Sequence, residues 1–280
     1  MGDVAQRDRL AAAAYTAPAL LYLGLLFLVP MAVVAGYSLR SASGGVTLAH
    51  YQRALDPLYL SVLLRSAFLA LITTVIALAV GYPCALALRG MSGRARALAL
   101  ALVILPSWLN LLVKNYAWIV ILRRQGVLNT ILLGAGIIDA PLPLLFNDAA
   151  VLTGLVHTYL PFMILPLYAA VDRMDGTLVE AARDLGAGRW RTFRHVVLPQ
   201  TRTGALVGTV LVFIPALGAF VTPDLLGGAR SLMIANLIES QVLQVRDWPF
   251  AAALSMFLIA LVLLALAGLH RAAGGREVAL

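Results

Sequence analysis

Long uncharged apolar runs alternate with short charged segments along the whole chain. Six of these runs hold 17 residues or more, at 10–39, 66–88, 97–113, 149–171, 203–223 and 248–270. A helix of about 17–25 apolar residues is long enough to cross a bilayer, and a charge at its centre costs roughly 2.5–3.5 kcal/mol on insertion scales. The pattern predicts an all-α integral membrane protein with six transmembrane helices, built as a single domain over residues 1–280.

The six predicted helices cover residues 15–39, 63–89, 97–121, 149–171, 200–223 and 248–270. The third includes Lys114, which we expect near a membrane face, where a long basic side chain can reach water. Residues 125–138 form an apolar interval of 14 residues, too short to span, and are predicted as a re-entrant or interfacial segment. The first run is longer than the ~7–15 apolar residues of a secretory signal, so we expect a retained helix.

Composition and charge support a membrane protein and orient it. Of the 280 residues, 61% are hydrophobic and 12% are charged, against about 45–50% and about 25% in a soluble domain. The net charge is +8, but the basic residues are dispersed between the apolar runs, which argues against a surface for nucleic acid. With the N-terminus inside, 13 basic residues lie on the cytoplasmic side and eight on the other, so the positive-inside rule places both termini in the cytoplasm.

The motifs of several catalytic and metal-binding classes are missing from the sequence. Lys114 is the only lysine and lies outside any G-x-x-x-x-G-K-[ST] loop, so ATP would have to be hydrolysed by another subunit. The four histidines have no Asp, Glu or Cys at ligand spacing and predict no metal site; they are His50, His157, His195 and His270. His157, inside an apolar run, is expected to be a hydrogen-bonded structural residue. We therefore expect a non-catalytic protein without a cofactor.

The most charged part of the chain lies between the fourth and fifth predicted helices, on the cytoplasmic side. Residues 175–198 are predicted to form a helix, a glycine turn and a second helix. Thr177 and Glu180 match a capping box, which would make Thr177 the N-cap of the first helix. Apolar residues then recur at helical spacing and form a narrow stripe, Leu178, Ala181, Ala182 and Leu185. Gly186 is predicted to end the helix in the left-handed conformation.

This segment resembles the signature of permease subunits in bacterial binding-protein-dependent ABC importers. The matching residues are Glu180-Ala181-Ala182, then Gly186 after three intervening residues, and Leu198-Pro199. Three further stretches resemble spermidine/putrescine permeases: Gly81-Tyr82-Pro83, Trp108 to Trp118, and Phe213 to Gly228. The resemblance covers most of the chain and implies a permease subunit in the bacterial cytoplasmic (inner) membrane that carries a small solute, a polyamine such as putrescine or spermidine.

The resemblance also implies partners and functional residues. The partners are two ATPase subunits, a second permease subunit, identical or different, and a periplasmic or extracellular solute-binding protein. The first short helix would dock in a groove of an ATPase, and the expected coupling residues are Glu180, Ala181, Ala182, Arg183, Asp184 and Gly186. Polyamines are flexible cations, which aromatic faces and carboxylates attract, so the residues expected along the substrate path are Trp108, Tyr116, Phe220 and Asp224.

Two alternatives remain open from the sequence. The chain could be an ion-coupled secondary transporter that works without an ATPase, although such carriers commonly hold carboxylates within their spans. It could also be an ABC permease for another solute, such as ferric iron or an anion. Separately, Gly204 and Gly208 form a small-xxx-small pattern, which predicts a close contact with another helix.

Overall fold

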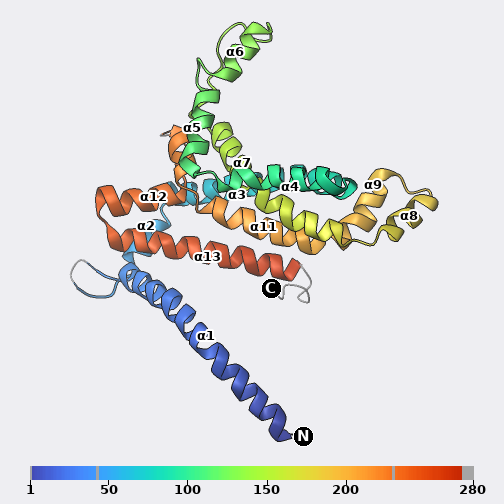
Figure 1. The fold of residues 1–280 in the computed structure, drawn as a ribbon. Helices are drawn as coiled ribbons and strands as arrows, with labels where there is room; N and C mark the ends of the chain where they lie inside the picture. The colour runs from blue at the N-terminus through green and yellow to red at the C-terminus, as the bar shows by residue number, and fades with distance from the viewer. Residues whose placement is uncertain (1, 42–43, 229–230, 273–280) are drawn as a thin grey trace. The chain divides into compact units, whose positions relative to one another are not determined.

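The computed structural model describes residues 2–41, 44–228 and 231–272, and these ranges contain helices and no strand. Figure 1 shows the order of the helices along the chain. The chain divides into two compact units, which are described separately. The first comprises Met1–Pro57 and Ile238–Ile259, and the second comprises Leu58–Leu237 and Ala260–Leu280.

The first unit contains α1 (Gly2–Ser38), α2 (Ala49–Ala54), the π-helix η4 (Gln241–Val245) and the first part of α13 (Trp248–Ala272). Arg53 Nη1 donates to Asp247 Oδ2 at 2.8 Å, and this ion pair joins α2 to the residue before α13. The rings of Tyr51 and Phe257 pack 5.7 Å apart. These contacts bring two segments together that lie far apart in the sequence.

The second unit holds most of the remaining helices. They are α3 (Pro57–Gly90), α4 (Gly93–Trp108), α5 (Leu111–Leu122), α6 (Val127–Gly134), α7 (Asp148–Asp172), α8 (Gly176–Asp184), α9 (Arg189–Thr192), the π-helix η1 (Phe193–Val197), α10 (Leu198–Gln200), α11 (Arg202–Leu217), the π-helix η2 (Pro223–Gly227) and α12 (Ile234–Ser240). The side chain of Asn147 accepts a hydrogen bond from Ala150 N and so starts α7.

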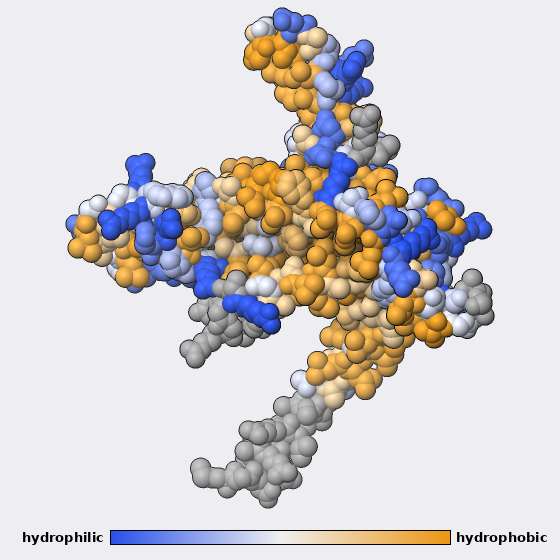
Figure 2. Space-filling model, turned by 180° about the vertical axis from the view of Figure 1, so that it is seen from behind, coloured by the Kyte–Doolittle hydropathy of each residue, from blue (hydrophilic) through white to orange (hydrophobic). Residues whose placement is uncertain are grey.

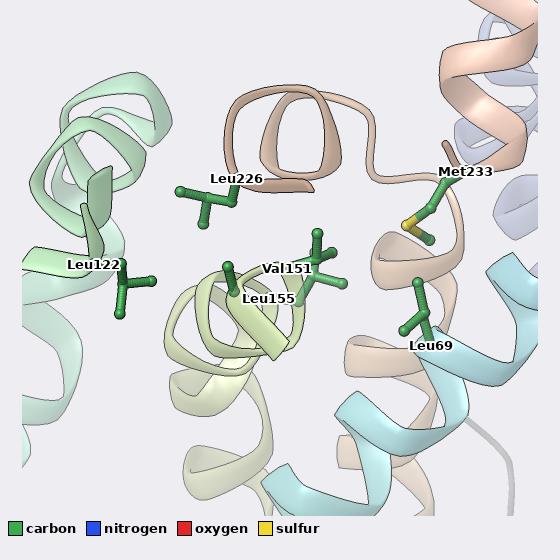
Figure 3. Close-up of a cluster of buried hydrophobic side chains, with 7 residues drawn as sticks. Leu69, Leu122, Val151, Leu155, Leu226 and Met233 are labelled. Carbon is green, nitrogen blue, oxygen red and sulfur yellow. The ribbon is translucent and has the colours of Figure 1, made fainter. Parts of the chain in front are cut away.

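The core of the second unit forms around α7. One buried cluster, drawn in Figure 3, consists of Leu69, Leu122, Ala150, Val151, Leu155, Leu226 and Met233. On the neighbouring helix, a Cβ at Gly204 would lie 2.6 Å from the carbonyl oxygen of Pro166, and one at Gly208 would lie 2.7 Å from Met163 Sδ. The predicted close contact through these glycines is confirmed, and it lets the backbones of α11 and α7 approach each other.

Within the described residues, four single helices are long and apolar enough to cross a membrane: Tyr15–Ser38, Pro57–Gly90, Asp148–Asp172 and Trp248–Leu269. Each includes most of a span predicted from the sequence. Two bent helix pairs would bring the number of spans to six if each counts as one: Gly93–Trp108 with Leu111–Gly134, bent by 97°, and Arg189–Gln200 with Arg202–Leu217, bent by 74°. The surface in Figure 2 is correspondingly apolar over the middle of the second unit.

Three features of the predicted spans need correction. The continuous helix expected over 97–121 is broken after Trp108, where the side chain of Asn110 accepts a hydrogen bond from Leu112 N and starts a new helix. The helix expected to reach residue 223 ends at Leu217. Lys114 is only 7% exposed and does not reach the surface as expected, because the break turns α5 onto α7 and η2.

The predicted re-entrant or interfacial segment contains α6, which follows α5.

Candidate functional site

The segment between α7 and α11 bends sharply, and we call it the elbow (residues 175–200). It consists of α8, a glycine turn, α9, η1 and α10. Figure 2 shows hydrophilic side chains gathered at the end of the second unit that carries α8 and α9, at the left of the view. No residue of α8 is buried. Leu178 is 50% exposed and Leu185 is 89% exposed, so the predicted apolar stripe of this helix faces outward.

The first helix of the elbow begins two residues earlier than the sequence pattern predicted. Asp175 is the N-cap, and its Oδ1 accepts from Thr177 N at 2.9 Å and from Thr177 Oγ1 at 2.8 Å. The assignment of Thr177 as the N-cap, paired with Glu180, was therefore wrong. Thr177 donates two hydrogen bonds to the Asp175 carboxylate. The bond from its hydroxyl has the larger effect and the bond from its backbone N–H the smaller one, and together they hold the pKa of the Asp175 carboxyl below its usual value. Threonine and aspartate are both favoured as N-caps, but here the Asp175 carboxylate accepts two hydrogen bonds and is the residue that caps α8.

Gly186 ends α8 in the conformation that the sequence predicted, with a φ of 79°. Gly186 N donates to Arg183 O at 2.8 Å, and Ala187 N donates to Ala182 O at 2.9 Å. These two bonds form the Schellman motif, which satisfies the last carbonyls of a helix. Gly188 then serves as the N-cap of α9 with a φ of −65°. The two short helices are thus joined by a turn with a defined geometry.

Aromatic contacts connect the elbow to the helix bundle. The ring of Trp190, on the outside of the elbow, stacks on Phe193 at 5.7 Å, and Phe193 meets Tyr82 of α3 edge to face at 5.2 Å. The Tyr82 hydroxyl lies 3.2 Å from Thr201 Oγ1 at the start of α11. A displacement of the elbow would therefore press directly on α3 and α11.

Two polar contacts fix the base of the elbow. Arg89, at the end of α3, donates to the carbonyl oxygens of Val171 and Met174 at 2.9 Å each. Asp175 N donates to Gln200 Oε1 at 3.2 Å, so the two ends of the elbow are tied together. The sequence analysis missed both contacts. A basic residue near helix C-termini is a general signal, but its partner helix is set by tertiary structure alone.

The predicted coupling residues lie together on α8 and its turn. Glu180, Ala181, Arg183 and Asp184 are exposed, and Ala182 is half-buried. Glu180 and Arg183 also border a hollow of about 460 Å³ between α8, α9 and the end of α3, which Arg89 and Arg189 line as well. The site presents small and apolar residues beside both signs of charge, a surface suited to binding another protein.

The predicted path residues come from three segments of the second unit. Trp108 ends α4 and is 81% exposed, Tyr116 lies on α5, and Phe220 and Asp224 flank the start of η2; all four are exposed. Asn115, which precedes Tyr116, donates from Nδ2 to Thr222 Oγ1 at 3.2 Å and holds α5 against the start of η2. This brings the segment of Tyr116 beside the segment of Asp224, whereas no such link is described for Trp108.

A half-buried histidine lies on α7. Trp118 Nε1 donates to His157 Nδ1 at 3.1 Å, so the hydrogen bond predicted for His157 is confirmed. In the part of the chain that the structure describes, no group of three or more His, Cys, Asp or Glu side chains could hold a metal ion.

The apolar helices define a multi-pass membrane protein, and its elbow carries an exposed short helix. Residues 77–270 match the family described as "Binding-protein-dependent transport system inner membrane component", and the chain belongs to this family. The predicted resemblance to permeases of binding-protein-dependent importers is thereby confirmed.

Comparison with individual proteins gives a narrower likeness. The chain is 46% identical over 212 residues to the spermidine/putrescine transport system permease protein PotB of Escherichia coli (strain K12), covering 76% of this chain and 77% of that protein. It is 40% identical over 262 residues to PotB of Haemophilus influenzae, covering 91% and 92%. A solved bacterial alginate ABC transporter, in complex with an alginate pentasaccharide-bound periplasmic protein, contains a chain of the same fold: TM-score 0.74, 18% identity, coverage of 97% and 96%.

Proposed function

We propose that this chain is the permease subunit of an ABC importer for polyamines and forms half of the translocation path. One observation supports the substrate class: this chain is 40–46% identical, over most of its length, to the PotB proteins, which are spermidine/putrescine permeases. The observation that carries the mechanism is the exposed α8, which presents Glu180 and Ala181 on the elbow and is followed by the turn at Gly186.

Contacts between the ends of the helices support six crossings with both termini in the cytoplasm. Arg65 pairs with Asp148, and these residues lie at the starts of the second and fourth predicted spans. Arg89 bonds to Met174, and these lie at the ends of the same two spans. Six alternating crossings place the first pair outside and the second pair inside. The elbow then lies in the cytoplasm, on the side with more basic residues.

The proposed partners follow from this arrangement. Two ATPase subunits bind the elbows of this chain and of a second permease, and a solute-binding protein delivers the substrate on the outer side. Closure of the ATPase pair would move α8, and the contacts of Phe193 with Tyr82 would pass this movement to α3 and α11. Glu180 would meet a basic group of the ATPase, while Ala181 and Ala182 permit close approach.

The test is reversal of the charge at Glu180. In proteoliposomes with the ATPase, the second permease and the binding protein, Glu180→Arg should abolish putrescine uptake and lower the ATPase activity that the binding protein stimulates. The matched control is Asp139→Arg, which makes the same charge change at another exposed acid and should leave both activities intact. Normal coupling in Glu180→Arg, or uptake driven by an ion gradient without any ATPase, would contradict the proposal.

A further inference from the structure

A second charged hollow lies in the first unit, far from the elbow in the sequence. It has a volume of about 920 Å³ and is bordered by Tyr37, Arg40 and His50 on one side and by Arg246, Asp247 and Trp248 on the other. The first group lies between the end of α1 and α2, and the second lies at the start of α13. None of these residues belongs to the elbow or to the predicted substrate path.

The acidic side chain of this hollow is already neutralised. Asp247 Oδ2 accepts from Arg53 Nη1 at 2.8 Å, and Oδ1 accepts from Phe250 N at 3.2 Å. The guanidinium carbon of Arg53 lies 3.9 Å from the centroid of the Phe250 ring, so Arg53 is also held in place. Asp247 thus forms its ion pair with Arg53. The hollow is also bordered by two exposed guanidinium groups, those of Arg40 and Arg246.

The backbone at Arg246 is in a conformation that arginine rarely adopts. Its φ is 61°, in the left-handed region that favours glycine. Asp247 N donates to Gln241 O at 2.9 Å and closes the turn after η4, so the conformation is imposed by the fold. A glycine would fit this turn without strain, and the arginine side chain is present at the cost of stability. Strain of this kind is found where a side chain has a functional role.

On the other side of the hollow, local contacts hold Arg40 in place. His50 Nε2 lies 3.1 Å from the carbonyl oxygen of Arg40, and Arg40 pairs with Val46 in an isolated bridge, so two contacts hold the backbone at Arg40. The guanidinium carbon of Arg40 lies 5.9 Å from the centroid of the Tyr37 ring. Two guanidinium groups on fixed backbone segments, with aromatic side chains beside them, suit a carboxylate.

We propose that this hollow receives an acidic side chain of the solute-binding protein when that protein docks on the outer face. The inference rests on the proposed function, because the loop after the first crossing and the loop before the last lie on the side opposite the elbow. The family depends on a binding protein by its description, and an acidic partner complements the surplus of positive charge. Complementary charges raise the rate of encounter and set the register of docking.

The experiment measures the affinity of the purified binding protein for the complete transporter in lipid nanodiscs. Arg246→Glu should weaken binding on the order of tenfold or more at low salt, and binding to the wild type should weaken as salt is raised. Arg246→Lys should retain most of the affinity, whereas Arg246→Gly should lose it while raising thermal stability. The ATPase activity without binding protein should stay unchanged in all three variants.

The matched control is Arg124→Glu, which reverses an exposed arginine on the same proposed side of the membrane but in the second unit. Equal losses in Arg124→Glu and Arg246→Glu would show a general charge effect and overturn the proposal, as would unchanged affinity in Arg246→Glu. Loss of retained anionic lipid in Arg246→Glu, with normal docking, would assign the hollow to a lipid headgroup instead. A wild-type transporter that no binding protein stimulates would refute the proposed function itself.

Discussion

The Nη2 atom of Arg89 donates a hydrogen bond of 2.9 Å to the carbonyl oxygen of Met174. Together with the bond from Nη1 to Val171, it places a cation at the C-terminus of α7, where the helix dipole is negative. The elbow starts at the next residue, Asp175. This one side chain of α3 therefore holds the end of α7, from which the elbow begins.

Removal of the Arg89 guanidinium should destabilise the protein. In Arg89→Met, two carbonyl groups lose their donor, and an unsatisfied buried group costs about 1–3 kcal/mol. We expect a lower melting temperature in detergent and weaker coupling between ATP hydrolysis and uptake. Arg94→Met, which removes an exposed arginine close in sequence, is the control and should melt like the wild type. Identical melting temperatures of the two variants would show that the hydrogen bonds of Arg89 add no stability.

The contact between α7 and α11 should not tolerate a methyl group at Gly204. The added Cβ would lie 2.5 Å from Ala170 Cβ and 2.6 Å from Pro166 O, and a backbone oxygen cannot move aside easily. Overpacking typically costs about 1–3 kcal/mol, so Gly204→Ala should unfold at a lower temperature. At Gly268 of α13 no atom lies within 4 Å of the added Cβ, and Gly268→Ala should be neutral or gain about 0.5–1 kcal/mol. A stable Gly204→Ala would mean that the two helices separate readily.

The start of α8 should loosen in acid. The pKa of Asp175 is lowered in the folded elbow by the hydrogen bonds from Thr177, while an unfolded aspartate titrates near pH ~3.9. The stabilisation by this carboxylate is therefore complete above that pH and is lost as the pH falls through the lower, folded-state pKa. Amide hydrogen exchange, corrected for its intrinsic pH dependence, should show α8 losing protection in this range.

Asp175→Asn is the matched variant for this measurement. Asparagine is also a good N-cap, and its side chain accepts a hydrogen bond but does not titrate. The protection of α8 should therefore change little with pH in Asp175→Asn. The same acid-induced loss in both proteins would exclude Asp175 as its cause.

Neutralisation of Asp224 should weaken uptake under the proposed function. Asp224 is exposed beside the buried Thr222 that holds η2 on α5, and exposed ion pairs contribute about 0.2–1 kcal/mol. Asp224→Asn should lower kcat/KM for putrescine uptake by up to about fivefold, with the ATPase activity in the absence of substrate unchanged. Glu239→Gln, at another exposed acid, should have no effect. Equal effects of the two variants would argue against a place for Asp224 on the path.

Local sequence signals predicted much of the elbow, because its geometry depends on neighbouring residues. Gly186 adopts the left-handed conformation expected of it, since only glycine enters that region without a steric cost. The apolar stripe of α8 could likewise be derived from its spacing. The error at Thr177 arose within the same local rules, because Asp175 competes for the cap two residues earlier.

Predictions that depended on a neighbouring helix were less successful. Lys114 was expected at a membrane face, yet it is buried, because the chain breaks after Trp108 and α5 turns back onto the bundle. No property of residues 97–121 alone specifies a bend of 97°. The contacts of Arg89 with α7 and of Asn115 with Thr222 are equally inaccessible to local reasoning.

The sequence by itself indicated a membrane protein, since six runs of 17 or more uncharged, mostly apolar residues can cross a bilayer as helices, which satisfy their own backbone hydrogen bonds in lipid. It also determined the small residues of α8 and the glycine that ends it. Only the tertiary structure decided that this helix is exposed, and that Asp247 is neutralised by Arg53 while Arg246 is held at a positive φ. Such features arise from contacts between segments far apart in the chain, whose free energies no local pattern contains.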